Sequence, residues 1–294
     1  MLLLALQRHP KDEIRAAFAD TGNEHGLTYE YVDYLQRETG VEIKRLRADF
    51  TQEIARKAEF VRNKWPAHGV SAEKIERALA ILKPTGNPYL DLCIWKGRFP
   101  SRKAQFCTQH LKTLPLNEYA LELIDRHGAV ESWQGVRADE SPNRAALPER
   151  ADLGGGLTLY RPLLRWDVEQ VFAMHRKFGI EPNPLYKLGM GRVGCMPCIN
   201  ARKGELLEIS KRFPDVIERI AEWEAIVRDA SKRDGATCFP AENRGKNLST
   251  QQAVDKANIR QMVEWAKTGR GGRQYDFTRL DEPAACASAY GLCE

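Results

Sequence analysis

A strand, a helix and a second strand follow one another closely near the start of the chain. Residues 14–19 are mostly apolar and end in the polar triplet DTG (20–22). An amphipathic pattern then runs over 28–40 and ends in glycine, and residues 41–49 read as another strand. Short strand–helix–strand connections are typical of a parallel sheet with right-handed crossovers. This stretch predicts an α/β fold, a twisted parallel sheet with helices on both faces.

The rest of the chain continues this alternation and then becomes helical. Further strands are predicted within residues 130–141 and 157–166, a helix between Asp167 and Gly179, and long C-terminal helices over 206–228 and 250–267. The last stretch is glycine-rich and irregular. We therefore expect two units, a core over 1–185 and a cysteine-containing helical region over 186–294 that packs on it and ends in a flexible tail.

Composition narrows the class of protein. The 294 residues are 43% hydrophobic and 29% charged, and no apolar run is long enough for a membrane span or a signal peptide. We expect a cytoplasmic protein without a membrane partner. The net charge of +5 suits a phosphate-bearing ligand. Seven cysteines without a secretion signal predict reduced thiols, metal ligands or catalytic groups rather than disulfides.

The first strand ends in side chains that suit a nucleotide. Ligands of open parallel sheets bind beyond the carboxyl ends of the strands, where Asp20, Thr21 and Gly22 are expected. The same three residue types also build ordinary strand-to-helix turns. A plain turn is therefore the alternative interpretation.

Basic residues follow in two loops. Arg137 and Arg144 lie after a predicted strand, and two guanidinium groups on one loop can bind a phosphate or sulfate through paired hydrogen bonds. An ion pair between Arg144 and Glu140 explains the same spacing. The second loop is either a solvated surface or a phosphate-facing segment, and it contains Arg98, Arg102 and Lys103.

Cys195 and Cys198 form a CxxC pair late in the chain. A thioredoxin-like redox pair usually opens a helix near the start of its fold. Zinc and iron–sulfur clusters both need four ligands, which single cysteines elsewhere can complete after folding. The remaining candidates are Cys107, Cys238, Cys286 and Cys293. The spacing favours a metal or cluster over structural thiols and leaves zinc and iron–sulfur open.

Several segments together resemble the phosphoadenosine phosphosulfate (PAPS) reductase family, which has a PP-loop adenine nucleotide alpha-hydrolase-like fold. They are FADTGNEHGLTYEYV, FCTQHLKTLPL, GVRADESPNRA, YRPLLRWDVEQVF, NPLYKLGMGRVGCMPC and the terminal YGLCE. The resemblance covers most of the chain. The second and fifth segments are similar to the cluster-binding motifs of adenylylsulfate reductases.

The resemblance implies a [4Fe–4S] cluster, with zinc as the lesser alternative. Those reductases hold the cluster with a tandem cysteine pair and a CxxC. Here Cys195 and Cys198 match the CxxC, and Cys107 matches the first tandem cysteine. Thr108 stands at the second tandem position. We expect Cys238 to supply the fourth ligand.

The resemblance also implies an oxidoreductase or sulfur transferase acting on an adenine nucleotide: PAPS, adenylylsulfate or ATP. Asp20, Thr21 and Gly22 would meet the nucleotide, and the basic residues would bind its phosphosulfate. The family's nucleophile is a cysteine in a mobile C-terminal motif, and Cys293 in YGLCE is the candidate here. A thioredoxin- or glutaredoxin-like protein would be the reductant.

Two other functions remain open. The chain could be an ATP-using component of a system that puts sulfur into DNA or tRNA, or a non-catalytic relative of the fold. Members of the family begin with an SGGKDS-like phosphate-binding loop, and this chain starts after it. We expect that loop to be encoded upstream of Met1.

Overall fold

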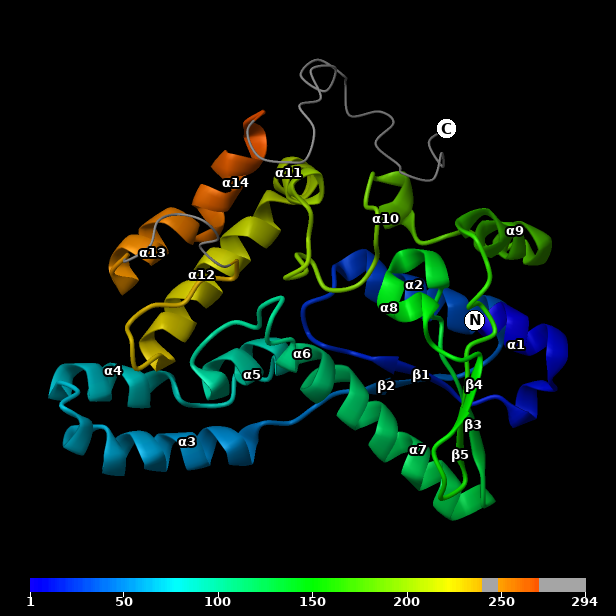
Figure 1. Cartoon of the computed structure of the whole chain (residues 1–294), viewed down its shortest axis with the longest axis horizontal. Coiled ribbons are helices and arrows are strands. Elements are labelled where there is room, and N and C mark those ends of the chain that lie inside the picture. Colours follow the sequence, from blue (N-terminus) through cyan, green and yellow to red (C-terminus); the bar gives the residue numbers. More distant parts are fainter. Residues whose placement is uncertain (240–247, 270–294) are drawn as a thin grey trace.

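The computed structural model describes residues 1–239 and 248–269, and Figure 1 shows how their helices and strands are arranged. In chain order these elements are α1 (Leu2–Arg8), β1 (Ala16–Ala19), α2 (Gly26–Thr39), β2 (Ile43–Leu46), α3 (Thr51–Lys64), α4 (Ala72–Ile81), α5 (Pro88–Lys96), α6 (Phe106–Thr108), α7 (Leu114–His127), β3 (Val130–Trp133), α8 (Pro142–Ala145), β4 (Arg150–Asp152), β5 (Leu157–Tyr160), α9 (Val168–Phe178), α10 (Pro184–Lys187), α11 (Lys203–Arg212), α12 (Pro214–Ala230), α13 (Thr250–Ala257) and α14 (Ile259–Lys267). Short 3-10 turns lie at Lys11–Glu13, Pro66–His68 and Ala138–Glu140, and a π-helical turn lies at Gln109–Thr113. Across these two ranges, no helix combines the length and the apolar character that a membrane crossing requires.

The strands confirm the predicted α/β class. β1 and β2 pair in parallel, with Ala16 opposite Ile43, and α2 makes the crossover between them. In a second sheet, β5 lies between β3, which is parallel to it, and β4, which is antiparallel. The sequence did not predict β4, because a strand of three residues is too short to show an alternating pattern.

The single sheet expected from the sequence is divided in the structure. In the described part of the chain, β1 and β3 do not pair with each other, and each is an edge strand. Between β2 and β3 the chain builds helices α3 to α7. Helix α7 then contacts both β1 and β3, so side-chain packing joins the two sheets.

Local residues set the ends of several helices where the sequence predicts them. Gly40 ends α2 with a left-handed φ of 63°, a conformation that glycine adopts without strain. Asp167 and Gln170 form a capping box at the start of α9, and Gly179 follows its end.

The two long C-terminal helices expected from the sequence are each broken. Pro214 starts α12 directly beyond Phe213, where α11 ends, because proline has no N–H to continue the hydrogen bonds of α11. Asn258 separates α13 from α14, and its side chain caps α14 by accepting the Gln261 N–H at 3.1 Å. The prediction of continuous helices over 206–228 and 250–267 is therefore wrong at these two positions.

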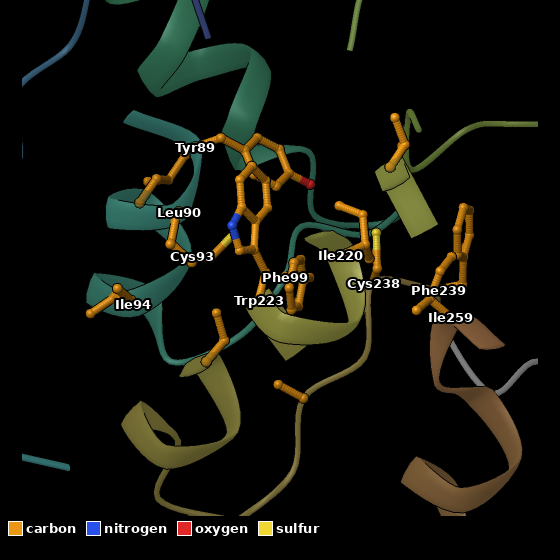
Figure 2. Close-up of a cluster of buried hydrophobic side chains, with 14 of the residues drawn as sticks. Tyr89, Leu90, Cys93, Ile94, Phe99, Ile220, Trp223, Cys238, Phe239 and Ile259 are labelled. Carbon is orange, nitrogen blue, oxygen red and sulfur yellow. The ribbon is translucent and has the colours of Figure 1, made fainter. Parts of the chain in front are cut away.

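The main core lies among the helices. Trp65, Ile94 and Ile220 are at most 1% exposed, and Tyr89 stacks on Trp223 with 5.8 Å between the ring centroids. Figure 2 shows part of this cluster, with the thiols of Cys93 and Cys238 inside it. Because the cluster draws residues from both sides of residue 185, the C-terminal helices share a core with α3, α4 and α5.

Candidate functional site

The Asp20 side chain in the loop after β1 forms hydrogen bonds and an ion pair with other residues of the protein. Asp20 is 7% exposed, and one carboxylate oxygen accepts the Gly22 N–H at 3.0 Å and the Tyr29 hydroxyl at 2.8 Å. The other oxygen lies 3.3 Å from Nε of Arg47, the residue that directly follows β2. This is the turn geometry that the sequence left as an alternative. A role of Asp20 in nucleotide binding stays a prediction.

Thr21 links this loop to the cysteine pair. Its hydroxyl donates to Glu24 Oε1 at 2.7 Å and lies 3.3 Å from Cys195 Sγ. Glu24 is 5% exposed, and its Oε2 accepts the Thr21 N–H at 3.1 Å and the Tyr29 hydroxyl at 3.2 Å. Thr21 and Glu24 therefore place a hydroxyl and a carboxylate beside the Cys195 thiol.

Asn23 holds the loop that carries the CxxC pair. It is fully buried; its carbonyl oxygen accepts the Met196 N–H at 2.7 Å, and its side-chain amide donates to Pro197 O at 3.2 Å. Arg219 of α12 donates to the Asn23 side-chain oxygen at 3.1 Å and to Met196 O at 2.8 Å. These contacts join the loop after β1, the CxxC loop and α12. The sequence analysis missed Asn23 and Arg219, because they meet only after distant segments fold together.

Next to this loop, Cys107 and Cys238 lie within range of the charge of the CxxC pair. Cys238 is buried, whereas Cys107, Cys195 and Cys198 are half-buried. Burial raises the pKa of the Cys238 thiol well above its ordinary value, and the nearby charges of Glu224, Cys198, Cys195 and Cys107 raise it further. Burial, followed by the charge of Cys198, also raises the pKa of Cys107. Cys238 thus lies within range of the charges of the other three thiols.

This donor set fits a thiolate-bound metal or cluster in residue type and location. Ligand distances are not formed: within residues 1–239 and 248–269, no three Cys, His, Asp or Glu side chains lie close enough to hold a metal ion. Burial raises the pKa of Cys195 to about 11, with the charge of Glu24 adding to the effect. A bound metal acts in the opposite direction, because it binds and stabilises the thiolate.

The positive charge of Lys112 affects the pKa values of Cys107 and Cys195. Burial and Cys198 raise the pKa of Cys107, and burial raises that of Cys195, whereas the charge of Lys112 lowers both. Lys112 lies in the π-helical turn Gln109–Thr113, directly after the short helix that carries Cys107. Such turns occur frequently at functional sites. Lys112 was not among the predicted site residues, although the FCTQHLKTLPL segment contains it.

The arginines after β3 differ in what they contact. Arg144 forms an ion pair with Glu140, as the alternative interpretation of their spacing predicts. Arg137 is largely buried, with 13% of its side chain exposed, and its Nη1 lies 3.2 Å from Asp139 Oδ2. Nε of Arg137 lies 3.8 Å from Glu140 Oε1, so the guanidinium is ion-paired with two carboxylates although its Nη1 makes no hydrogen bond within the described residues.

Arg161 is a second buried guanidinium at a neighbouring strand end. It directly follows β5, is 6% exposed, and donates through Nη1 to Pro148 O at 2.8 Å. Its Nε has no hydrogen-bond partner in the part of the chain that the structure describes. The Ala138 N–H donates to Leu164 O at 2.9 Å, so the loops after β3 and β5 lie side by side. The sequence analysis did not single out Arg161, although it belongs to the YRPLLRW segment.

The loop that contains Arg98, Arg102 and Lys103 lies apart from the loop after β1. Asn87, at the start of α5, donates to Gly22 O at 2.7 Å, whereas Arg98 follows the other end of α5. The nine residues of α5 separate these two ends by about 13 Å. Arg98 lies over the ring of Phe106 at 5.5 Å. The structure therefore does not bring Arg98 beside Asp20, and the proposed phosphate contacts of Arg98, Arg102 and Lys103 stay predictions.

The predicted nucleophile, Cys293, lies outside the described residues, as does the alternative ligand Cys286. Their roles stay predictions from the sequence.

Comparisons with known proteins agree on a family. The model of the phosphoadenosine phosphosulfate reductase domain matches residues 1–201. An uncharacterised 37.8 kDa protein of Escherichia phage 186 is 48% identical over 295 residues, which cover 94% of this chain and 88% of that protein. The adenosine 5′-phosphosulfate reductase of Allochromatium vinosum is 40% identical over 84 residues, which cover 28% of this chain and 33% of that enzyme.

Among solved structures, a phosphate complex of phosphoadenylyl-sulfate (PAPS) reductase from Candida auris covers 67% of this chain and 87% of its own. The TM-score is 0.38 and the sequence identity 17%, a likeness too distant to bear on the site. The family model, by contrast, spans about two thirds of the chain and contains β1, the loop after it, three of the four predicted cysteine ligands and both buried strand-end arginines. On that match, the chain belongs to the phosphoadenosine phosphosulfate reductase domain family.

Proposed function

We propose that this protein is a thiol-dependent enzyme that acts on an adenine sulfonucleotide and carries a [4Fe–4S] cluster bound by Cys107, Cys195, Cys198 and Cys238. The observation that carries the proposal is that Cys107 and Cys238, from separate parts of the chain, lie within range of the charge of the CxxC pair. Four thiolates suit a [4Fe–4S] cluster, and zinc is the lesser alternative. The matched relatives include adenosine 5′-phosphosulfate reductases, which supports a sulfonucleotide as substrate.

The buried arginines support an anionic ligand at the strand ends. Arg137 and Arg161 each retain a buried N–H group without a hydrogen-bond partner in the described residues. Guanidinium groups bind phosphate and sulfate oxygens through strong charge-assisted hydrogen bonds. A phosphosulfate placed beyond β3 and β5 would use these donors, and it would lie where open parallel sheets bind their ligands.

Cys293 is the proposed nucleophile. Its thiolate attacks the sulfur of the phosphosulfate, the bond from sulfur to the bridging oxygen breaks, and the adenosine phosphate leaves with the electron pair. Cys293 then carries an S-sulfonate group. A thioredoxin- or glutaredoxin-like dithiol reduces this group to sulfite and the free cysteine, and itself becomes a disulfide.

Iron and acid-labile sulfide, measured on protein purified without oxygen, test the cluster. We expect about four of each per chain. Serine in place of Cys107, Cys195, Cys198 or Cys238 should lower the iron content sharply. Cys93→Ser is the matched control, because Cys93 is buried in the same cluster of side chains as Cys238 but is not a proposed ligand.

Zinc without iron would make the site a structural one, and a metal-free protein would contradict the cluster. The reaction is tested separately by sulfite release from adenylylsulfate or PAPS in the presence of a dithiol reductant, with Cys293→Ser as the inactive variant. If Cys293→Ser released sulfite at the unaltered rate, Cys293 would not be the nucleophile. Pyrophosphate release from ATP that depends on DNA or tRNA, without sulfite, would favour a role in nucleic-acid sulfur modification instead.

A further inference from the structure

Glu224 is a buried carboxylate of α12 that binds two backbone segments. It is 6% exposed. Its Oε1 accepts the Cys238 N–H at 2.8 Å, and its Oε2 accepts the Ile259 N–H at 3.0 Å. The cation that acts on it, Arg260, is itself paired with Glu218. The backbone donors of two other segments therefore occupy both oxygens of Glu224.

The two segments have different places in the fold. Ile259 is the first residue of α14, and the N–H groups of a first helical turn have no partner within the helix. A carboxylate is favourable there because it also faces the positive end of the helix dipole. Cys238 lies in the loop that leaves α12, and Figure 2 shows it beside Ile220 of that helix, with Ile259 nearby. One side chain thus fixes α14 and the cysteine loop together.

A carboxylate at this position is costly for stability alone. At 6% exposure the carboxylate is almost fully withdrawn from water, and burial of a charged group carries a desolvation cost. An uncharged side chain of similar size would fill the same volume with less desolvation. What a carboxylate adds is the ability to accept from two separate N–H groups at once.

We propose that Glu224 is a positioning residue that holds the backbone of Cys238 and thereby sets where its thiol lies relative to Cys195, Cys198 and Cys107. The inference rests on the proposed function, because it takes Cys238 as the fourth ligand of the thiol site. Cys238 is 1% exposed, and its backbone N–H is held by Glu224. Residues that orient a ligand without touching the metal set how firmly the metal is held. The placement of the fourth thiol therefore depends on Glu224.

The test compares Glu224→Gln with Glu218→Gln, an exposed glutamate on the same helix. The first readout is the rate at which the full chain, purified without oxygen, loses iron to a chelator. We expect Glu224→Gln to lose iron about ten times faster than the unaltered protein, the scale of one hydrogen bond to a charged group. Glu218→Gln should lose it at the unaltered rate.

The second readout needs no cluster. In metal-free protein, iodoacetamide alkylation of Cys238 is compared with that of Cys93, which is also buried. We expect Glu224→Gln to speed alkylation of Cys238 at least tenfold, again the scale of that one hydrogen bond, and to leave Cys93 unchanged. An equal rise at both cysteines would overturn the proposal in favour of a general structural role. No rise at either would overturn it by showing that Glu224 does not restrain Cys238.

Glu224→Asp keeps the charge but is one methylene too short to reach both N–H groups. It should behave like Glu224→Gln, and it serves as the measured variant if the glutamine does not fold. An unaltered protein without iron would contradict the proposed cluster, whereas the alkylation comparison would still decide whether Glu224 positions Cys238.

Discussion

Gly22 shows how the loop after β1 depends on a single residue. Its φ is 79°, which side chains rarely adopt, and an added Cβ would lie 2.8 Å from both Asn87 Oδ1 and Pro88 Cδ. A substitution therefore meets backbone strain and a close contact with the start of α5. The DTG triplet needs glycine here to let α5 approach the loop.

We expect Gly22→Ala to lower the free energy of unfolding by about 2 to 4 kcal/mol, the sum of a positive-φ penalty and a steric shift. Urea denaturation measures the loss. Gly26→Ala is the control, because an added Cβ there meets nothing within 4 Å and Gly26 is the first residue of α2. That variant should be neutral or slightly more stable. Equal effects of the two substitutions would show that the close approach of α5 is not what requires glycine.

At the scale of elements, Lys74 joins α4 to the end of α12. Figure 1 shows these two elements meeting. Lys74 is 6% exposed, and its ammonium donates to Arg228 O at 2.9 Å, Asp229 O at 3.1 Å and Asp234 Oδ1 at 2.7 Å. A cation at a helix C-terminus is favourable, because the last carbonyl groups lack partners. The contact anchors the N-terminal helices to the helix that holds Glu224.

The pH dependence of stability tests this contact. The hydrogen bond from Lys74, with that from Arg77, lowers the pKa of Asp234 in the folded protein. Because the folded pKa lies below the unfolded value of about 4, the contribution is present above pH 4 and is lost as pH falls through the folded pKa. Asp234 is half exposed, so we expect Asp234→Asn to cost at most about 1 kcal/mol at neutral pH. The difference in the free energy of unfolding between Asp234→Asn and the unaltered protein should disappear at acidic pH.

Urea midpoints of the two proteins, measured from neutral pH down to about pH 3, follow this convergence. Asp125→Asn, at an exposed position of α7, is the control and should match the unaltered protein throughout. A deficit that stayed constant down to the lowest pH would contradict the role of the Asp234 carboxylate.

At the scale of the whole molecule, Asn23 and Arg219 connect three distant parts of the chain. The side chain of Asn23 binds Pro197 O and Arg219, and Arg219 also binds Met196 O. The CxxC loop is also held by the backbone hydrogen bond to Asn23, by the contacts of Cys195 with Thr21 and Glu24, and by the burial of Met196 in the core.

We expect Asn23→Ala to lower the free energy of unfolding by about 2 to 4 kcal/mol, because it leaves buried polar groups of both partners unpaired. Hydrogen exchange measured by mass spectrometry should be faster over residues 195–199 than in the unaltered protein. Asn117→Ala, at an exposed position of α7, should change neither quantity. Unchanged exchange over 195–199 in Asn23→Ala would show that the side chain does not hold the CxxC loop.

The sequence by itself determined the features that depend on neighbouring residues. Gly40, Asp167 and Gly179 mark helix ends through local hydrogen bonds and φ angles, and alternating strands and helices gave the α/β class. Pro214 was also readable as a break, although we predicted a continuous helix there. The sequence segments that resemble the PAPS reductase family were enough to identify it, and they contain Cys107, Cys195 and Cys198.

Only the tertiary structure decided how these parts meet. It split the strands into two sheets and brought Cys238 within range of the charges of the other three thiols. It also gave Asp20 and Thr21 hydrogen-bond partners within the protein. It also set Glu224 against two backbone donors. In these contacts, a buried polar or charged group binds a segment that is distant in the sequence. The partners of such a group are therefore set by the segments that pack around it. That packing is a property of the assembled core, which no local pattern encodes.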